Sequence, residues 1–546
     1  MAVAVLGCLG HPAFSQTFPD AGSLTPQGED FQPVTPKAPA ILPQAPEASP
    51  KATSADTTPI PVKTLHVTGA TVFPAATLEA LVADQAGGKH TLGELQVAAA
   101  RITTYYRTAG YFLARAYLPP QQMQDGVVTI AVVEGRLSGV ELDNASKLSD
   151  ATARARLAVL PVGAPLQKEA TDRALLLLSD LPGVGGVDSR LAPGANPGET
   201  TLVARLREAP GITGRLEADN YGVENSGRYR YGAAADASSL LGYGERFSAR
   251  VLGNDMGELA YAHLGAQLPV GADGLTLGFG LLRTQYSLGG AFANLNAVGW
   301  LNSAEVTLRY PLLRSANLNV YGQAGLEGRR MSDEIGSFDS VAKQHATVGT
   351  LSLTADWRDA LGGGSANQAS VTLGSGQLGI DSSAAAAIDA LGPQTAGHFN
   401  KFTASLDRQQ ALVDKLSLAV KLRGQWADSN LTSSEKFSLG GNDAVRAYPT
   451  GEAPGDRGWL ATGELRYAFT NELMASVFYD AGGIEVNAKP YLPTDNRRHL
   501  SGAGIGFAGA WKDFDWRLAV AWRITSASVS EDDQVPRGWM QVGWRF

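Results

Sequence analysis

Hydrophobic and polar residues alternate in short segments from about residue 210 to the end of the chain. The stretch 415–426 places these apolar residues on one face: Leu416, Leu418, Val420, Leu422 and Trp426. Its other face carries Lys, Ser, Arg and Gln, and the stretches 305–310 and 515–523 have the same pattern. This period of two predicts β-strands, and an apolar face opposite a charged face is typical of strands between lipid and a polar lumen. A soluble β-sandwich would show the same alternation in any single strand.

The alternating segments number 16 and are separated by glycine-rich connections. They begin near residues 212, 226, 244, 257, 274, 300, 316, 346, 367, 399, 414, 458, 473, 499, 513 and 537. An even number is typical of single-chain bacterial barrels, whose closure removes unpaired edges that lipid could not satisfy. The sequence therefore predicts a 16-stranded transmembrane antiparallel β-barrel over residues 210–546, in which the longest gap between strands is 428–457.

Two small α/β modules are predicted before the barrel, at 62–136 and 137–209. In the first, one face of the predicted helix 91–108 carries Leu92, Leu95, Ala99, Ile102 and Tyr106, and Gly110 ends the helix. Its other predicted elements are a strand at 62–67, a helix at 77–82, and strands near 112–118 and 127–133. The second module repeats this β-α-α-β-β order, with a strand at 137–142, helices at 150–159 and 167–179, and strands at 183–191 and 200–207.

The N-terminal 61 residues do not show this patterning. Residues 1–15 form a short stretch that starts with ten apolar residues and ends in Ala13-Phe14-Ser15. This is typical of a signal peptide with a small-residue cleavage site, although the usual basic start is missing. The only cysteine, Cys8, lies inside it. Residues 16–61 are rich in proline and predict an extended linker. No helical stripe is visible there, so the sequence gives little support for a segment that plugs the pore.

Composition excludes several classes of function. A formal net charge of −8 argues against a nucleic-acid-binding protein, and no apolar run approaches the ~20 residues of a transmembrane helix. The chain has no glycine-rich phosphate loop, no Gly-x-Ser-x-Gly elbow and no His-x-x-x-His pair. We therefore predict that the protein is not an enzyme and has no catalytic residues, metal or cofactor.

The first module carries an ordered set of motifs: Tyr106-Arg107, Gly110-Tyr111, Ala114 to Pro119, Gln121 or Gln122, and Val127 to Leu137 with Glu134-Gly135-Arg136. Together they resemble the POTRA repeat of two-partner secretion transporters, the TpsB family of haemolysin and filamentous haemagglutinin secretion and activation type. Apolar and aromatic residues would form the core of any α/β module, and glycines would form turns in any fold. That explanation accounts for the residue types but not for their joint order.

Two motifs in the barrel half are similar to paired signatures of the same superfamily. The first is Phe437-Ser438-Leu439-Gly440-Gly441 with Val445-Arg446-Ala447-Tyr448, between the eleventh and twelfth predicted strands. The second is Phe478-Tyr479-Asp480-Ala481-Gly482 in the thirteenth. The resemblance implies that the first forms the tip of an inward-folded extracellular loop and the second lies on the inner wall. Family tips usually read Val-Arg-Gly-Tyr, so Ala447 is a departure.

The resemblance also implies that Arg446 pairs with Asp480. Alternation places Phe478, Asp480 and Gly482 on one face, which should be the lumen because a carboxylate is costly toward lipid. A guanidinium can hold a carboxylate through two parallel hydrogen bonds, which fix direction as well as distance. In a wet lumen we expect a modest energy from this pair. Our hypothesis is that Arg446 and Asp480, supported by Val445, Tyr448, Phe478 and Gly482, hold the loop tip in its transport-competent position.

The resemblance implies a type V secretion pore in the outer membrane of a Gram-negative bacterium, with the POTRA modules in the periplasm. Its partner would be a TpsA-type exoprotein whose N-terminal secretion domain docks on those modules. The last strand, with Met540, Val542, Trp544 and Phe546, looks like the C-terminal signature that the barrel-assembly machinery reads. The alternatives are an outer-membrane protein assembly factor, which shares POTRA modules and the loop motif, and a passive porin, which has no reason to carry two soluble modules.

Overall fold

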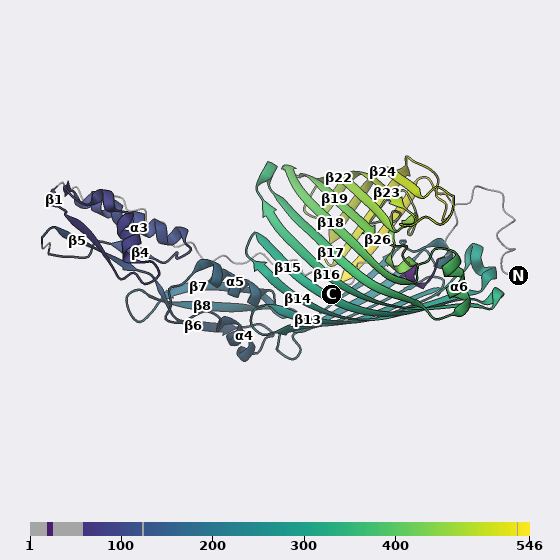
Figure 1. The fold of residues 1–546 in the computed structure, drawn as a ribbon, viewed down its shortest axis with the longest axis horizontal. Helices are drawn as coiled ribbons and strands as arrows, with labels where there is room; N and C mark the ends of the chain where they lie inside the picture. Colours follow the sequence, from purple (N-terminus) through teal and green to yellow (C-terminus); the bar gives the residue numbers. More distant parts are fainter. Residues whose placement is uncertain (1–18, 26–57, 123–124, 532) are drawn as a thin grey trace.

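The computed structural model describes residues 19–25, 58–122, 125–531 and 533–546. Two α/β modules extend from one end of a closed barrel, and the second module lies against the barrel rim (Figure 1). The predicted signal peptide at 1–15, with Cys8, lies outside the described residues, and so does most of the predicted linker at 16–61.

The first module has the predicted order of elements, with short additional strands. Its elements are β1 (Ile60–Pro61), β2 (Thr64–Thr68), α2 (Ala75–Ala80), η1 (Ala83–Gln85), β3 (Lys89–His90), α3 (Leu92–Thr108), β4 (Arg115–Tyr117) and β5 (Val127–Val133). Helix α3 begins at a capping box formed by Thr91 and Glu94, and the chain leaves it at Gly110, whose φ of +90° favours glycine. Ala98 joins the predicted buried face of α3, whereas Leu92, in the first turn, stays half-buried.

The second module contains β6 (Arg136–Asn144), α4 (Asp150–Leu157), α5 (Lys168–Ser179), β7 (Val184–Pro193) and β8 (Glu199–Glu208). Strand β8 lies in the middle of its sheet, parallel to β6 and antiparallel to β7. The sheet packs on α4 and α5 through a core that includes Leu157, Leu175, Leu178 and Leu202. Strand β7 therefore forms an edge of this sheet.

Sixteen strands close the barrel, as predicted. They are β9 (Ile212–Asp219), β10 (Arg230–Ser238), β11 (Arg246–Asn254), β12 (Leu259–Val270), β13 (Leu275–Ser287), β14 (Ala297–Arg314), β15 (Leu318–Ile335), β16 (Ser340–Asp359), β17 (Ser365–Ile380), β18 (Gly397–Val413), β19 (Leu416–Ala427), β22 (Arg457–Ala468), β23 (Leu473–Glu485), β24 (Arg497–Trp511), β25 (Phe514–Arg523) and β26 (Arg537–Arg545). The predicted starts differ from these by a few residues. The largest difference is at β16, predicted from 346, because its first residues, from Ser340, alternate only weakly between apolar and polar. Strand β26 pairs with β9 and closes the ring.

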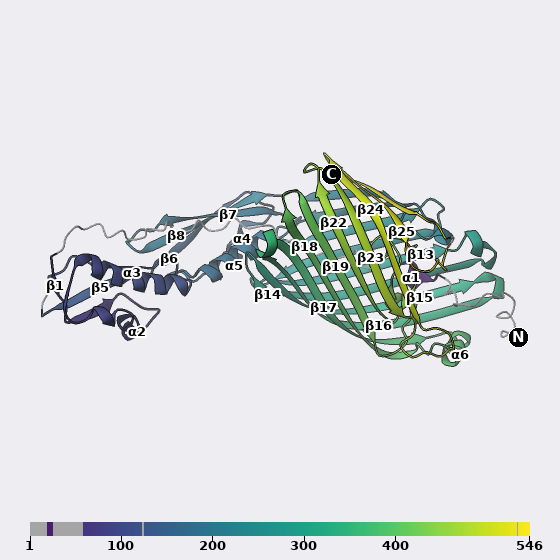
Figure 2. The same ribbon diagram turned by 90° about the horizontal axis from the view of Figure 1, so that it is seen from above.

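The loops at the end away from the modules carry most of the remaining elements (Figures 1 and 2). These are η2 (Glu224–Ser226), η3 (Gly290–Leu295), η4 (Gly336–Phe338), α6 (Ser383–Leu391), η6 (Ser433–Glu435), β20 (Phe437–Ser438) and β21 (Pro454–Gly455), whereas η5 (Leu361–Gly363) lies in a turn at the module end. Within the described ranges, no helix is both long and apolar enough to cross a membrane.

The barrel is apolar outside and charged inside. Large apolar side chains on the predicted apolar faces are exposed, including Leu308, Leu422, Trp426 and Leu518. Carboxylates such as Asp219, Glu435 and Asp480 are buried instead. This distribution is the reverse of a soluble protein and is expected where lipid surrounds the outer face. It confirms the transmembrane barrel and excludes the soluble β-sandwich.

An ion pair joins the second module to the barrel rim. The guanidinium of Arg314, at the end of β14, donates to both carboxylate oxygens of Asp180, just after α5, at 2.6 and 2.8 Å. Its remaining nitrogen donates to Asn319 at 3.0 Å, and its side chain is 1% exposed. Nearby, Arg173 of α5 donates to the carbonyl of Pro311 at 2.8 Å. The module is therefore fixed in direction relative to the barrel.

We expect Arg314→Ala to loosen this joint, because removal of one partner of a buried pair costs about 3–5 kcal/mol. Hydrogen–deuterium exchange of the α5 amides in the full chain should rise, while exchange in the barrel strands stays unchanged. The control is Arg154→Ala, which removes an exposed guanidinium 3.8 Å from Asp150 on α4 and should change little. Unchanged α5 exchange in Arg314→Ala would contradict a directional role for the pair.

Candidate functional site: an inward loop held to the barrel wall

The segment 428–456, here called the pore loop, connects β19 to β22 and folds back into the barrel. Its strands β20 and β21 pair with each other. Apolar side chains of the pore loop, including Leu439 and Val445, pack against inward residues of the wall such as Phe478 and Leu500. These four side chains are at most 5% exposed. The pore loop is therefore packed on the wall.

Arg446, near the tip of the pore loop, contacts Asp480 on β23. Its Nε and Nη2 donate to the two carboxylate oxygens at 2.9 Å each, and its backbone N–H donates to Oδ2 at 3.1 Å. The side chain of Asp480 is fully buried and that of Arg446 is 11% exposed. The contact is bidentate, as the resemblance implies, but drier than the wet lumen we expected. Loss of one partner would leave a buried charge, so the contact matters more than a surface pair.

Three further groups complete the environment of Arg446. Its Nη1 donates to Glu464 on β22 at 3.1 Å, and its guanidinium lies 3.3 Å from the ring centroid of Phe478. The indole of Trp539 on β26 donates to the carbonyl of Arg446 at 2.7 Å. Sequence reasoning did not find Glu464 or Trp539. The sequence offered one signal for Glu464, its place among the alternate positions of a strand that face inward. In the structure, cross-strand pairing places it opposite Phe478.

The structure also places the predicted supporting residues at this site. Val445 and Tyr448 are fully buried, and the hydroxyl of Tyr448 donates to the carbonyl of Ser526 at 2.7 Å. Gly482 faces the lumen like Asp480, and a Cβ there would lie 2.5 Å from Leu439 of the pore loop. Only glycine allows this close approach between loop and wall.

The departure at Ala447 is accommodated by β24, the wall strand that pairs with β23. Ala447 is not among the residues with positive φ, so the backbone does not require glycine there. Its methyl group packs against β24 at Gly502, where an added Cβ would lie 2.5 Å from the Cβ of Ala447. The wall leaves room for the methyl group of Ala447 because residue 502 is a glycine.

Two more buried carboxylates hold the ends of the pore loop. Glu435, 2% exposed, forms ion pairs with Arg329 on β15 and Lys401 on β18. Glu452, fully buried, pairs with Arg498 on β24 and accepts the backbone N–H of Ser530 at 3.0 Å. The pore loop is therefore anchored at its beginning, tip and end, on different parts of the wall.

A short N-terminal helix, α1 (Ala21–Leu24), also lies inside the barrel (Figure 2). Its first N–H donates to Asp333 of β15 at 3.0 Å, and Thr25 donates to Thr284 of β13 at 3.1 Å. Gly22 lies so close to the pore loop that a Cβ would be 2.6 Å from the hydroxyl of Ser433. This segment corrects the expectation that 16–61 is extended throughout, because contacts with the wall stabilise one turn that no periodicity could reveal.

Two motif residues of the first module, Glu134 and Tyr106, bond to each other inside that module, beside its junction with the second. Glu134, 3% exposed, accepts hydrogen bonds from the N–H groups of Thr71 and Val72, the hydroxyl of Thr71 and, at 2.8 Å, the hydroxyl of Tyr106. Burial raises the pKa of Glu134, but these hydrogen bonds prevail and hold it below its ordinary value. Burial, and then the bond to Glu134, raise the pKa of Tyr106.

Gly110 and Gly135 lie at the same junction. The carbonyl of Gly110 accepts the N–H of Lys168 in the second module at 2.9 Å, and that of Gly135 accepts the N–H of Leu166 at 3.0 Å. A Cβ at Gly110 would lie 2.4 Å from Glu169. The motif therefore joins the two modules as well as forming the core of the first.

In the part of the chain that the structure describes, no group of three or more His, Cys, Asp or Glu residues is placed to hold a metal ion. The geometry is instead that of a transport barrel: a polar lumen occupied by an anchored loop, with two α/β modules fixed at one rim. These features define an outer-membrane protein-transport barrel.

Comparison with known proteins identifies the family. Residues 198–509 match the model of the haemolysin secretion/activation proteins ShlB/FhaC/HecB, and residues 60–135 match the ShlB-type POTRA domain. The chain belongs to this family of two-partner secretion transporters, and it is an outer-membrane pore that secretes a partner exoprotein. Its modules are POTRA domains and lie in the periplasm, so the opposite end of the barrel is extracellular.

Curated relatives and solved structures agree with this assignment. The heme/hemopexin transporter protein HuxB of Haemophilus influenzae strain 86-028NP is 27% identical over 403 residues, which cover 72% of this chain and 70% of that protein. The outer membrane transporter CdiB of Escherichia coli strain 536 is 24% identical over 420 residues, which cover 74% of this chain and 69% of that protein. The structure of CdiB from Escherichia coli has the same fold, with a TM-score of 0.75 at 19% identity over 93% of this chain and 94% of that one.

Proposed function

We propose that this pore accepts its exoprotein unfolded in the periplasm, through docking of the exoprotein's N-terminal secretion domain on the two POTRA domains. Strand β7 is an edge of the second POTRA sheet, and an extended segment can pair with such an edge through backbone hydrogen bonds. We take 62–136, 137–209 and 210–546 as the limits of the POTRA domains and the barrel. The chain has no enzymatic step in this scheme.

The observation that carries the proposal is the buried bidentate contact between Arg446 and Asp480. It fixes the tip of the pore loop on the wall, while α1 packs on the same loop at Ser433. An exoprotein can pass only if these occupants are displaced or leave room beside them. We propose that Arg446 and Asp480 keep the loop in the position that leaves a path, and that α1 leaves the lumen during transport.

The relatives suggest which exoproteins to test. HuxB carries the name heme/hemopexin transporter, so an exoprotein that binds haem or hemopexin is one candidate cargo. We also propose that the barrel-assembly machinery recognises the last strand through Phe546, whose backbone N–H and carbonyl bond to Gly214 of β9 at 3.0 and 2.8 Å.

The test is to delete this gene and follow two products. The partner exoprotein should disappear from the medium and reappear when the full chain is supplied. Levels of other outer-membrane barrels should stay constant. A general loss of other barrels would favour an assembly factor, and unchanged export in the deletion strain would contradict the proposal.

A further inference from the structure

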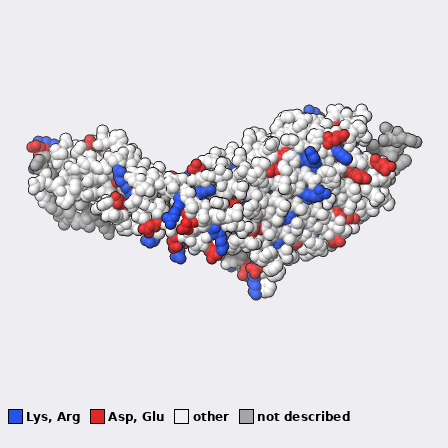
Figure 3. Space-filling model, turned by 90° about the horizontal axis from the view of Figure 1, so that it is seen from below, with Lys and Arg blue, Asp and Glu red and all other residues white. Residues whose placement is uncertain are grey.

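A basic row crosses the outer face of the barrel in its extracellular half. Cross-strand pairing aligns Arg283 of β13, Asn302 of β14, Arg330 of β15 and His345 of β16. The side chains of Arg283, Arg330 and His345 are exposed. Lys343 lies in the next outward row toward the extracellular end, where it pairs across strands with Ser332, which in turn pairs with Trp300. Figure 3 shows several basic side chains, with acidic ones among them, on the half of the barrel away from the POTRA domains.

The rows below the basic row become apolar. The next outward row contains Leu281, Ala304, Gly328 and Thr347, and the following one contains Phe279, Val306 and Leu326. Phe279, Leu281, Val306 and Leu326 are 40–60% exposed, as expected for side chains that face lipid. The basic row therefore lies where the lipid-facing band ends, at the depth of the outer leaflet's headgroups.

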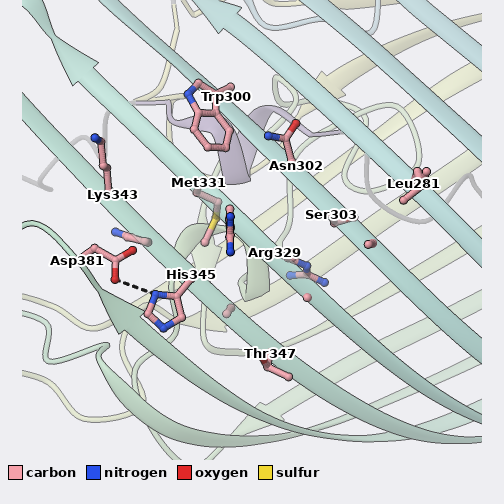
Figure 4. Close-up of a pocket in the computed structure, with 15 residues that line it drawn as sticks. Leu281, Trp300, Asn302, Ser303, Arg329, Met331, Lys343, His345, Thr347 and Asp381 are labelled. Atoms are coloured by element: carbon pink, nitrogen blue, oxygen red, sulfur yellow. Dashed lines mark hydrogen bonds and ion pairs between the residues drawn. The ribbon is translucent and has the colours of Figure 1, made fainter.

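This part of the outer surface contains two depressions, both of which include the small residues Ala304 and Gly328. A depression of about 890 Å³ is lined by Trp300, Asn302, Lys343, His345 and Asp381, and Figure 4 shows Asp381 joined to His345 at its edge. A second depression of about 970 Å³ lies against it and is lined by apolar residues such as Phe247, Leu264 and Phe279. The two share Leu281, Ala304, Gly328 and Thr347. Together they form a groove that is charged at one end and apolar along the rest.

The basic groups are not neutralised by the protein. Among the residues that the structure describes, the guanidinium of Arg330 and the ammonium of Lys343 have no carboxylate within ion-pair distance. Arg283 donates only to the amide oxygen of Asn302, at 3.3 Å. Two acidic residues lie near the row: Asp381, 2.9 Å from His345, and Glu334, which is exposed on β15 one outward row beyond Lys343. A net positive charge at this depth attracts anionic groups of lipids.

We infer that this groove binds a phosphorylated glycolipid of the outer leaflet. The phosphates would accept hydrogen bonds from Arg330, Lys343 and Arg283, and an acyl chain would lie over Gly328 and along the apolar depression. The site faces lipid and not the lumen, so a polar protein partner would have to displace lipid to reach it. A free anion would use the basic row but gain nothing from the apolar part.

The test uses the full chain in detergent micelles, with bisphosphorylated lipid A, the same lipid without phosphates, and inorganic phosphate as probes. Each basic residue near an anionic headgroup contributes a factor of about five, so Arg330→Gln with Lys343→Gln should weaken lipid A binding about 30-fold. The matched control, Lys415→Gln with Lys512→Gln, removes the same charge from exposed periplasmic turns and should bind like the wild type. The dephosphorylated lipid should bind the wild type as weakly as lipid A binds the double variant.

A third variant tests the apolar part. Gly328→Leu places a side chain in open space, because a Cβ at Gly328 meets nothing within 4 Å. It should weaken lipid A binding and leave any response to inorganic phosphate unchanged. Equal lipid A affinity in the wild type and the Arg330/Lys343 variant would overturn the inference. Equal affinity for inorganic phosphate and lipid A would also overturn it, since the groove would then be a simple anion site.

Discussion

Secretion of the partner exoprotein is expected to fall at least about tenfold when either charge of the pore-loop contact is reversed, by Arg446→Glu or by Asp480→Arg. Each change leaves two like charges in a buried site, and disruption of a buried pair costs about 3–5 kcal/mol, equivalent to a factor of 100 or more in the position of the loop tip. The measurement is the amount of exoprotein in the medium. Heat-modifiable migration of the barrel in the membrane fraction checks that it still folds.

The double reversal should restore only part of the secretion, because Glu464 also contacts Arg446. In the double variant the new glutamate at 446 would face Glu464 as well as the new arginine at 480. Addition of Glu464→Gln should therefore raise secretion further. The matched control is Asp443→Arg, which reverses a more exposed pore-loop contact with Lys421 and Arg423 and should have a smaller effect. Secretion at the wild-type level with either single reversal would refute the role of the contact.

The barrel could be predicted from the sequence because its main signal is local. In each strand the residues that face lipid alternate with those that face the lumen. In β19, for example, Leu422 and Trp426 are exposed on the outside and Gln425 is buried inside. Lipid on one side and water on the other impose this alternation on every strand. No long-range contact has to be known before such a pattern can be read.

The anchors of the pore loop depend on long-range contacts and were missed for that reason. Glu435 meets Arg329 and Lys401 across the lumen, and no spacing in the sequence relates these residues. Glu452 reaches the loop before β26 in the same way. Helix α1 is a single turn, too short for a periodic pattern, and it depends on the wall for its stability. Arg446 and Asp480 were found only because each lies in a family motif.

The order of the POTRA motif has a physical explanation in the domain junction. Core packing requires Tyr106 and apolar strands, but it does not require Gly110, Glu134, Gly135 and Arg136 together. In the structure the carbonyls of Gly110 and Gly135 accept N–H groups of the second domain, and Arg136, the first residue of β6, donates to the carbonyl of Gly163 at 3.1 Å. Glu134 bonds within the first domain, beside these contacts. The joint order reflects a surface shared by two domains, which the pattern of one module cannot reveal.

The second large effect is expected at Glu134, a buried carboxylate of the first domain beside that junction. Glu134→Ala leaves the hydroxyls of Tyr106 and Thr71 and two backbone N–H groups without their acceptor. An unsatisfied buried donor costs about 1–3 kcal/mol, so we expect the opening free energy of the first POTRA domain to fall by about 3 kcal/mol or more. Hydrogen–deuterium exchange of the α3 and β5 amides in the full chain measures it. The control is Glu79→Ala, a more exposed carboxylate that accepts the backbone N–H of Val67 at 3.1 Å and lies 3.0 Å from Nδ1 of His66.

The same carboxylate should make this domain sensitive to acid. Because the pKa of Glu134 is lowered in the folded state, its contribution is fully present above the ordinary glutamate pKa of about 4.3 and is lost as pH falls through the folded value. Protection of α3, corrected for intrinsic exchange, should therefore fall between about pH 5 and pH 3 in the wild type and less in Glu134→Gln, which starts lower and has no charge to lose. An equal fall in both proteins would assign the acid sensitivity to other groups and remove Glu134 as its cause.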